Sequence, residues 1–100
     1  MDNQLIVRMP KEIDHHQAKE IAGALDYKIS VGGVRSLVFD FKDTEFMDSS
    51  GIGIVIGRSR TMNYYQGEII AKNMGKRVRR IFLAAGMDKL ITLEPEEEEE

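Results

Sequence analysis

The sequence predicts a single α/β domain in which helices flank a small, mostly parallel β-sheet. Short apolar runs alternate with stretches in which apolar residues recur every three or four positions, the spacings of strands and of amphipathic helices. Such alternation favours parallel strands joined by right-handed crossovers. The length of 100 residues fits one domain rather than two.

The first strand and helix are predicted from the segment that begins at Leu5. The apolar run 5–9 stops at Pro10, which is typical of a strand near the edge of a sheet. Asp14 and Gln17 have the spacing of a capping box and therefore predict a helix start. This helix is expected to bury one face, made of Ala18, Ile21, Ala22, Leu25 and Ile29.

The middle of the chain predicts an inner strand followed by a glycine-containing helix. Residues 37–41 are nearly all apolar, as in a parallel strand that is covered on both faces. From Ile52 to about residue 65 the pattern is helical. Gly53 and Gly57 lie one turn apart, and we expect them to allow a close approach to a neighbouring element, since glycine in a helix costs about 1 kcal/mol against alanine.

The last third predicts one more strand, one more helix and a short final strand. Residues 68–72 form the strand, and residues 90–93 the final one. Gly86 is placed to end the helix in a left-handed conformation, with Met87 packing back on its last turn. The predicted buried face of this helix consists of Met74, Val78, Ile81, Phe82 and Ala85.

Charge is divided unevenly between the domain and its C-terminal end. The net charge is −3, but Glu94 and the run 96–100 hold six of the 17 acidic residues, which leaves 11 against 14 Lys and Arg. We therefore expect a folded domain over residues 1–94 and a disordered acidic tail over 95–100 that favours solubility. The absence of cysteine excludes disulfides and thiolate chemistry, and no apolar run is long enough to cross a membrane. With no signal-peptide pattern, a cytoplasmic location is expected.

Asp48-Ser49-Ser50-Gly51 is the main candidate site because it stands where a helix begins. The first amides of a helix lack internal partners and its dipole favours negative charge, so a phosphate on serine would be tolerated there. Phosphorylation would add about −1.5 to −2 charges and would change the surface that a partner meets. The plainer interpretation is a helix cap alone, because Asp and Ser are preferred at that position.

Other chemistries find little support. Neither serine has the flanking glycines of a hydrolase elbow, and the adjacent His15 and His16 do not supply a triad, so an enzyme is not expected. Adjacent histidines on a helix point apart, so no metal site is expected. Gly51 and Gly53 lack the third glycine of a dinucleotide fingerprint and no phosphate-binding lysine loop is present, so no cofactor is expected.

A basic patch occurs in the third predicted helix and consists of Lys76, Arg77, Arg79 and Arg80. Nucleic-acid binding would require a wider patch or interleaved aromatic residues, so we do not expect it. The solvated face of an amphipathic helix explains the patch most simply. Contact with an acidic partner, or with the acidic tail of the chain itself, is the second interpretation.

Two segments of the sequence resemble STAS-domain anti-sigma factor antagonists. Residues 12–16 are similar to the family's Glu-Leu-Asp-His-His turn, and residues 46–53, followed by 55–58, are similar to its phosphorylation segment. The likeness spans roughly residues 5–93 and is greatest with the sporulation branch. In departure from the family pattern, the strand usually found ahead of Leu5 and the usual final helix are not expected, and Lys11 replaces a glycine.

The resemblance implies a phosphorylation switch. The unphosphorylated antagonist would bind an anti-sigma factor that is also a serine kinase, and so release the sigma factor. The kinase would phosphorylate Ser49 and end the binding, and a serine phosphatase would reset the switch. The resemblance also implies that Ser50 supports the loop and that Asp14 and Asp48 flank the site, with Gly51 and Gly53 in the same segment. A free monomer is expected; the alternative is a STAS scaffold subunit of a signalling or lipid-transport assembly.

Overall fold

Two parallel sheets organise the fold. The computed structural model describes residues 3–95. The larger sheet has the strand order β1 (Gln4–Arg8), β3 (Ser36–Asp40), β5 (Glu68–Lys72) and β6 (Thr92–Leu93), with every neighbouring pair parallel. The smaller sheet pairs β2 (Glu12–Ile13) with β4 (Phe46–Met47), also in parallel. The predicted α/β fold with a mostly parallel sheet is therefore confirmed.

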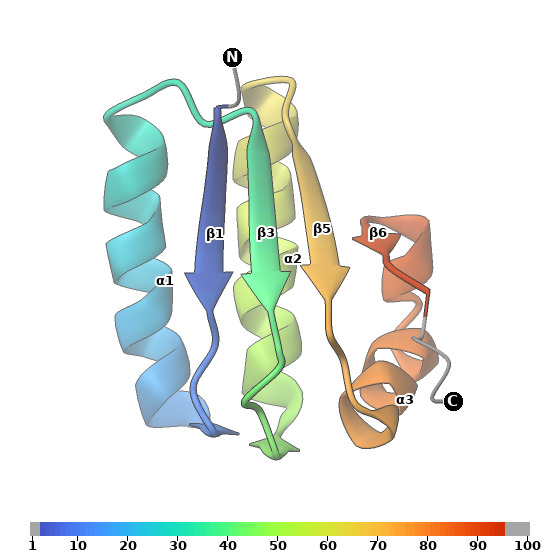
Figure 1. Ribbon diagram of the computed structural model, residues 1–100. Helices are drawn as coiled ribbons and strands as arrows, with labels where there is room; N and C mark the ends of the chain where they lie inside the picture. Colours follow the sequence, from blue (N-terminus) through green and yellow to red (C-terminus); the bar gives the residue numbers. More distant parts are fainter. Residues whose placement is uncertain (1–2, 96–100) are drawn as a thin grey trace.

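Three helices connect the strands. These are α1 (His15–Ser30), α2 (Ser49–Tyr64) and α3 (Lys76–Ala84), and a short 3-10 helix, η1 (Met87–Lys89), precedes β6. In Figure 1, α1 and α2 lie behind the larger sheet and run side by side, so that both begin at the lower end of the molecule. The shorter α3 lies at the lower right, beyond the end of β5.

The core lies between the larger sheet and the helices. Alternate residues of the inner strands point toward the helices and are buried, among them Leu37 and Phe39 of β3 and Ile69 of β5. Phe41, just after β3, meets Phe82 of α3 with ring centroids 5.3 Å apart in an edge-to-face arrangement. This contact fastens α3 to the end of the sheet from which the candidate site is built.

Sequence periodicity located the larger elements but not the smaller sheet. The strand 68–72 is observed with the predicted bounds, β1 is an edge strand as expected, and Gly86 adopts the left-handed conformation with φ 73° after α3. The final strand covers residues 92–93 rather than 90–93, because the N–H groups of Leu90 and Ile91 still donate back to the Met87 carbonyl of η1. The β2–β4 pair was missed since two-residue strands carry no alternation to detect.

The expectation of close approach at Gly53 and Gly57 is wrong. A Cβ built at either position meets no atom within 4 Å, and Gly53 is exposed. Gly51 is the glycine of this helix that is buried, and a Cβ there would run into the Cγ and Sδ atoms of Met47. The close contact therefore lies in the first turn of α2, against the preceding strand, and not farther along the helix.

Candidate functional site

The smaller sheet brings the starts of α1 and α2 together. In the β2–β4 register Ile13 is paired with Met47, so the next residues, Asp14 and Asp48, occupy equivalent positions directly after the two strands. The backbone N–H of Asp48 also donates to the carbonyl of Ile13 at 3.2 Å. Ile13 and Met47 are both buried, which anchors the pair in the core.

Each aspartate caps the helix that follows it. Asp14 Oδ1 accepts hydrogen bonds from the backbone N–H groups of His16 at 2.9 Å and Gln17 at 3.1 Å, and the predicted capping box is present. Asp48 Oδ1 accepts from the N–H of Ser50 at 2.7 Å. The side chains thus satisfy helix amides that would otherwise lack partners.

Ser49 lies open to solvent at the first position of α2. Its side chain is exposed, and its hydroxyl makes no hydrogen bond within residues 3–95. The next residue, Ser50, is half-buried. Of the two serines, Ser49 therefore offers the more accessible hydroxyl to another protein.

Gly51 holds the first turn of α2 close to β4. Its backbone N–H donates to the Asp48 carbonyl at 3.0 Å, and the Met47 side chain occupies the space that a Cβ would take. The position of Ser49 is consequently fixed by a buried strand residue on one side and a buried glycine on the other. Gly53, on the exposed side of the same helix, contributes no such contact.

The loop between β3 and β4 is tied down at its start by Asp40. Burial tends to raise the pKa of this carboxyl group, but hydrogen bonds from Asn73 Nδ2 and the Lys42 N–H, both 3.0 Å, together with the positive charges of Arg8 and Lys72, hold the pKa below its usual value. Asp40 is therefore stable as a buried carboxylate, and it orders the segment that leads to the candidate site.

Two further residues border the candidate site, although the sequence pattern alone assigns neither a role in it. His15 is exposed at the first position of α1, equivalent to Ser49 in α2. Phe46 of β4 leaves 46% of its surface exposed and pairs with Glu12 of β2. A repeated pattern, a buried apolar residue followed by a capping aspartate, precedes both helices and is the signal that would have found this symmetry.

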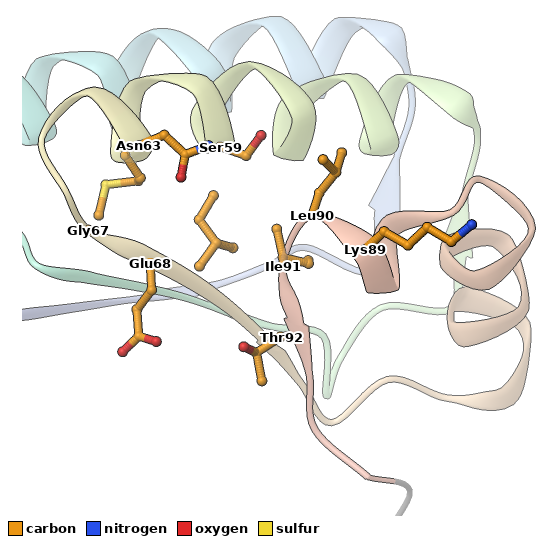
Figure 2. Close-up of a pocket in the computed structure, with 10 residues that line it drawn as sticks. Ser59, Asn63, Gly67, Glu68, Lys89, Leu90, Ile91 and Thr92 are labelled. Atoms are coloured by element: carbon orange, nitrogen blue, oxygen red, sulfur yellow. The ribbon is translucent and has the colours of Figure 1, made fainter.

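One groove of the described chain lies away from the serine site. It has a volume of about 290 Å³ and runs between α2 and the segment from η1 to β6. Figure 2 shows Ser59 and Asn63 of α2 on one side, with Leu90 and Ile91 facing them. Ser59 is ten residues from Ser49, about 15 Å along the helix, so this groove is separate from the serine site.

The candidate site offers a hydroxyl and two carboxylates but no group of metal ligands. Among residues 3–95, no three His, Cys, Asp or Glu side chains gather closely enough to hold a metal ion. Within the same residues, no helix has both the length and the apolar character needed to cross a membrane. The arrangement supplies an exposed hydroxyl, that of Ser49, to which a charged group could be attached, and it holds this hydroxyl at the capped start of α2.

Comparison with known proteins identifies the family. The model of the STAS domain matches residues 1–100. This chain is a STAS domain. A relative from Paenibacillus polymyxa, named an anti-sigma F factor antagonist, is 32% identical over 89 residues, which cover 89% of this chain and 76% of the relative. One with the same name from Lysinibacillus sphaericus is 31% identical over 83% of this chain and 71% of its own length.

Solved structures agree with the sequence comparison. The anti-sigma factor antagonist SpoIIAA in its unphosphorylated form matches this STAS domain with a TM-score of 0.83 and 31% identity, over 93% of this chain and 81% of that one. The phosphorylated form of the Bacillus cell fate determinant SpoIIAA matches with a TM-score of 0.75 and 29% identity, over 96% and 86%. The resemblance to STAS anti-sigma factor antagonists is confirmed.

Proposed function

We propose that this STAS domain is an anti-sigma factor antagonist switched by phosphorylation of Ser49. The unphosphorylated form binds an anti-sigma factor serine kinase, and the sigma factor is released. Transfer of a phosphate to Ser49 ends the binding, and a serine phosphatase restores the active form. The observation that carries the proposal is the exposed hydroxyl of Ser49 at the start of α2, which makes no hydrogen bond to the part of the chain that the structure describes.

The geometry supports a change of surface rather than a change of fold. A phosphate on Ser49 would stand at the positive end of the α2 dipole, where an anion is tolerated. It would also stand next to the capping carboxylate of Asp48 and, across the β2–β4 pair, near Asp14. A partner adapted to that surface would meet about −1.5 to −2 units of added charge beside two carboxylates, which adds repulsion.

Names of relatives support the class of partner. SpoIIAA was solved in unphosphorylated and phosphorylated forms, and the relatives described above are named anti-sigma F factor antagonists. We propose a protein kinase and a phosphatase as partners, a location in the cytoplasm, and a monomer when no partner is bound. We propose no catalytic role, cofactor or nucleic-acid contact for the domain itself.

The central experiment combines phosphate mapping with binding. The domain is incubated with its candidate anti-sigma factor kinase and ATP, and the site is mapped by mass spectrometry. We expect one phosphate on Ser49, none in Ser49→Ala, and full labelling in the matched variant Ser50→Ala. Ser49→Asp should bind the kinase at least about tenfold more weakly, equivalent to about 1.4 kcal/mol.

Two results would contradict the proposal. One is phosphate on Ser50 alone, and the other is undiminished binding by Ser49→Asp when Ser49→Ala also binds. The alternative role as a scaffold subunit predicts a stable assembly, so light scattering after size-exclusion chromatography separates the two. A monomeric mass supports the switch, and a defined oligomer supports the scaffold.

A further inference from the structure

The exposed surface of α3 carries an unbalanced cluster of positive charge. Lys76, Arg77 and Arg80 are exposed and Arg79 is half-buried, while Val78 and Phe82 face the core. Within residues 3–95, none of the four cations has a carboxylate within ion-pair distance. Lys76 and Arg80 are one turn apart on the helix, where like charges repel.

The start of α3 makes the imbalance larger. Its N-cap is Gly75, which has no side chain to accept the free amides, and its first turn contains no acidic residue. Lys76 and Arg77 instead place positive charge at the positive end of the helix dipole. An anionic neighbour lying along this surface would relieve both repulsions.

The chain brings its own acidic segment to that surface. Arg79 Nη1 donates to the backbone carbonyl of Glu94 at 2.7 Å, and the Glu94 N–H in turn donates to the Ala71 carbonyl at 2.9 Å. The described chain thus ends beside α3, with five glutamates still to follow at 96–100. Fully extended, five residues reach about 17 Å, whereas the nine residues of α3 span about 13 Å.

We propose that the acidic segment 96–100 docks on the basic surface of α3, defined as Lys76, Arg77, Arg79 and Arg80. The opposite charges match, and the tether at Glu94 gives the segment a high effective concentration at this surface. Because single exposed ion pairs are weak, the contact is a dynamic one that depends on the number of charges and is screened by salt.

Docking would mask the exposed face of α3, a helix that contacts the strand before the serine site. The helix α3 packs against β4, the strand that leads into Asp48 and Ser49. An acidic partner that approached α3 would have to displace the segment first. The proposal does not depend on phosphorylation, and its test leaves Ser49 unchanged.

Paramagnetic labelling measures the contact directly. The chain has no cysteine, so Glu100→Cys gives a single site for a nitroxide. At about 10 mM salt, where charges act over about 30 Å, the amide signals of α3 should fall to less than about half of their diamagnetic intensity. At about 1 M salt most of this loss should disappear, while the fold remains unchanged.

Two sets of charge-removing variants test whether opposite charges cause the signal loss at α3. Changing the glutamates at 96–99 to glutamine keeps the length and the label but should abolish the loss at α3. Arg77→Gln combined with Arg80→Gln should do the same, whereas the exposed control pair Lys42→Gln with Arg60→Gln should have little effect. Signal loss that ignores salt and the glutamine variants, or that is spread evenly over the domain, would overturn the proposal.

Discussion

The backbone N–H of Asp48 donates a hydrogen bond of 3.2 Å to the carbonyl of Ile13, joining two segments that are 35 residues apart. Through this bond and the Ile13–Met47 pair, the caps of α1 and α2 are set side by side. The relationship means that Asp14 and Asp48 shape one surface together, although each belongs to a different helix.

Removing the cap of α2 should weaken the domain without changing its fold. Asp48→Ala leaves the Ser50 N–H without its acceptor, and we expect a loss of about 1 kcal/mol in the free energy of unfolding. Asp48→Asn keeps an acceptor oxygen and should lose much less. Urea denaturation of the two variants tests this, and equal losses would show that the charge rather than the hydrogen bond matters.

Two glycines of α2 should respond to alanine with opposite signs. Gly51→Ala forces a methyl group into the Met47 side chain and should cost about 1–3 kcal/mol. Gly53→Ala meets no atom within 4 Å on an exposed helix face and should stabilise the domain by up to about 1 kcal/mol. Thermal and urea unfolding measure both, and equal effects would refute the packing argument.

Lowering the pH should reveal how much the Asp40 carboxylate contributes to the free energy of unfolding. Its pKa in the folded domain lies below the usual 3.8, so the carboxylate stabilises the fold above about pH 4, and this contribution is lost as pH falls through the folded pKa. Asp40→Asn keeps an oxygen for Asn73 and Lys42 but has no charge to lose. The difference in unfolding free energy between the two proteins should therefore shrink below pH 4; a constant difference would count against this account.

Two ion pairs should contribute unequally to the stability of the domain because their burial differs. Arg58 Nε lies 3.0 Å from Asp26 Oδ1, and the Arg58 side chain is only 13% exposed between α1 and α2. Asp26→Ala leaves that guanidinium without its carboxylate and should cost about 1–3 kcal/mol. Asp43→Ala breaks the exposed pair with Arg8 and should change stability by no more than about 0.5 kcal/mol. Comparable losses in both would contradict the ranking.

The sequence was informative where a pattern repeats and silent where a contact joins distant segments. The helix after Asp14 follows from its cap and its apolar face. The second helix was predicted from Ile52 onward and begins three residues earlier, at Ser49, directly after its cap Asp48. The sequence placed both serines at a helix start, but only the family resemblance favoured Ser49, and the structure shows Ser49 exposed and Ser50 half-buried. The β2–β4 pair was not, since its register depends on tertiary packing of Ile13 and Met47.

The expectation of close approach at Gly53 and Gly57 failed for a physical reason. One-turn spacing of Gly53 and Gly57 suggests a helix–helix contact, but spacing does not tell which face of the helix is covered. Burial of Gly51 is decided by the long side chain of Met47, which folds back beneath the first turn. Only the three-dimensional arrangement distinguishes these cases.

Met47 beneath Gly51 has a consequence for any enzyme that modifies Ser49. The Ser49 hydroxyl lies on a formed helical turn of α2, so an enzyme that acts on the native domain must accept that shape. A synthetic peptide with the sequence of this segment would contain the same residues but would not hold the helical turn. Such an enzyme would recognise the folded domain rather than the local sequence. Unfolded copies of the chain would then not be modified.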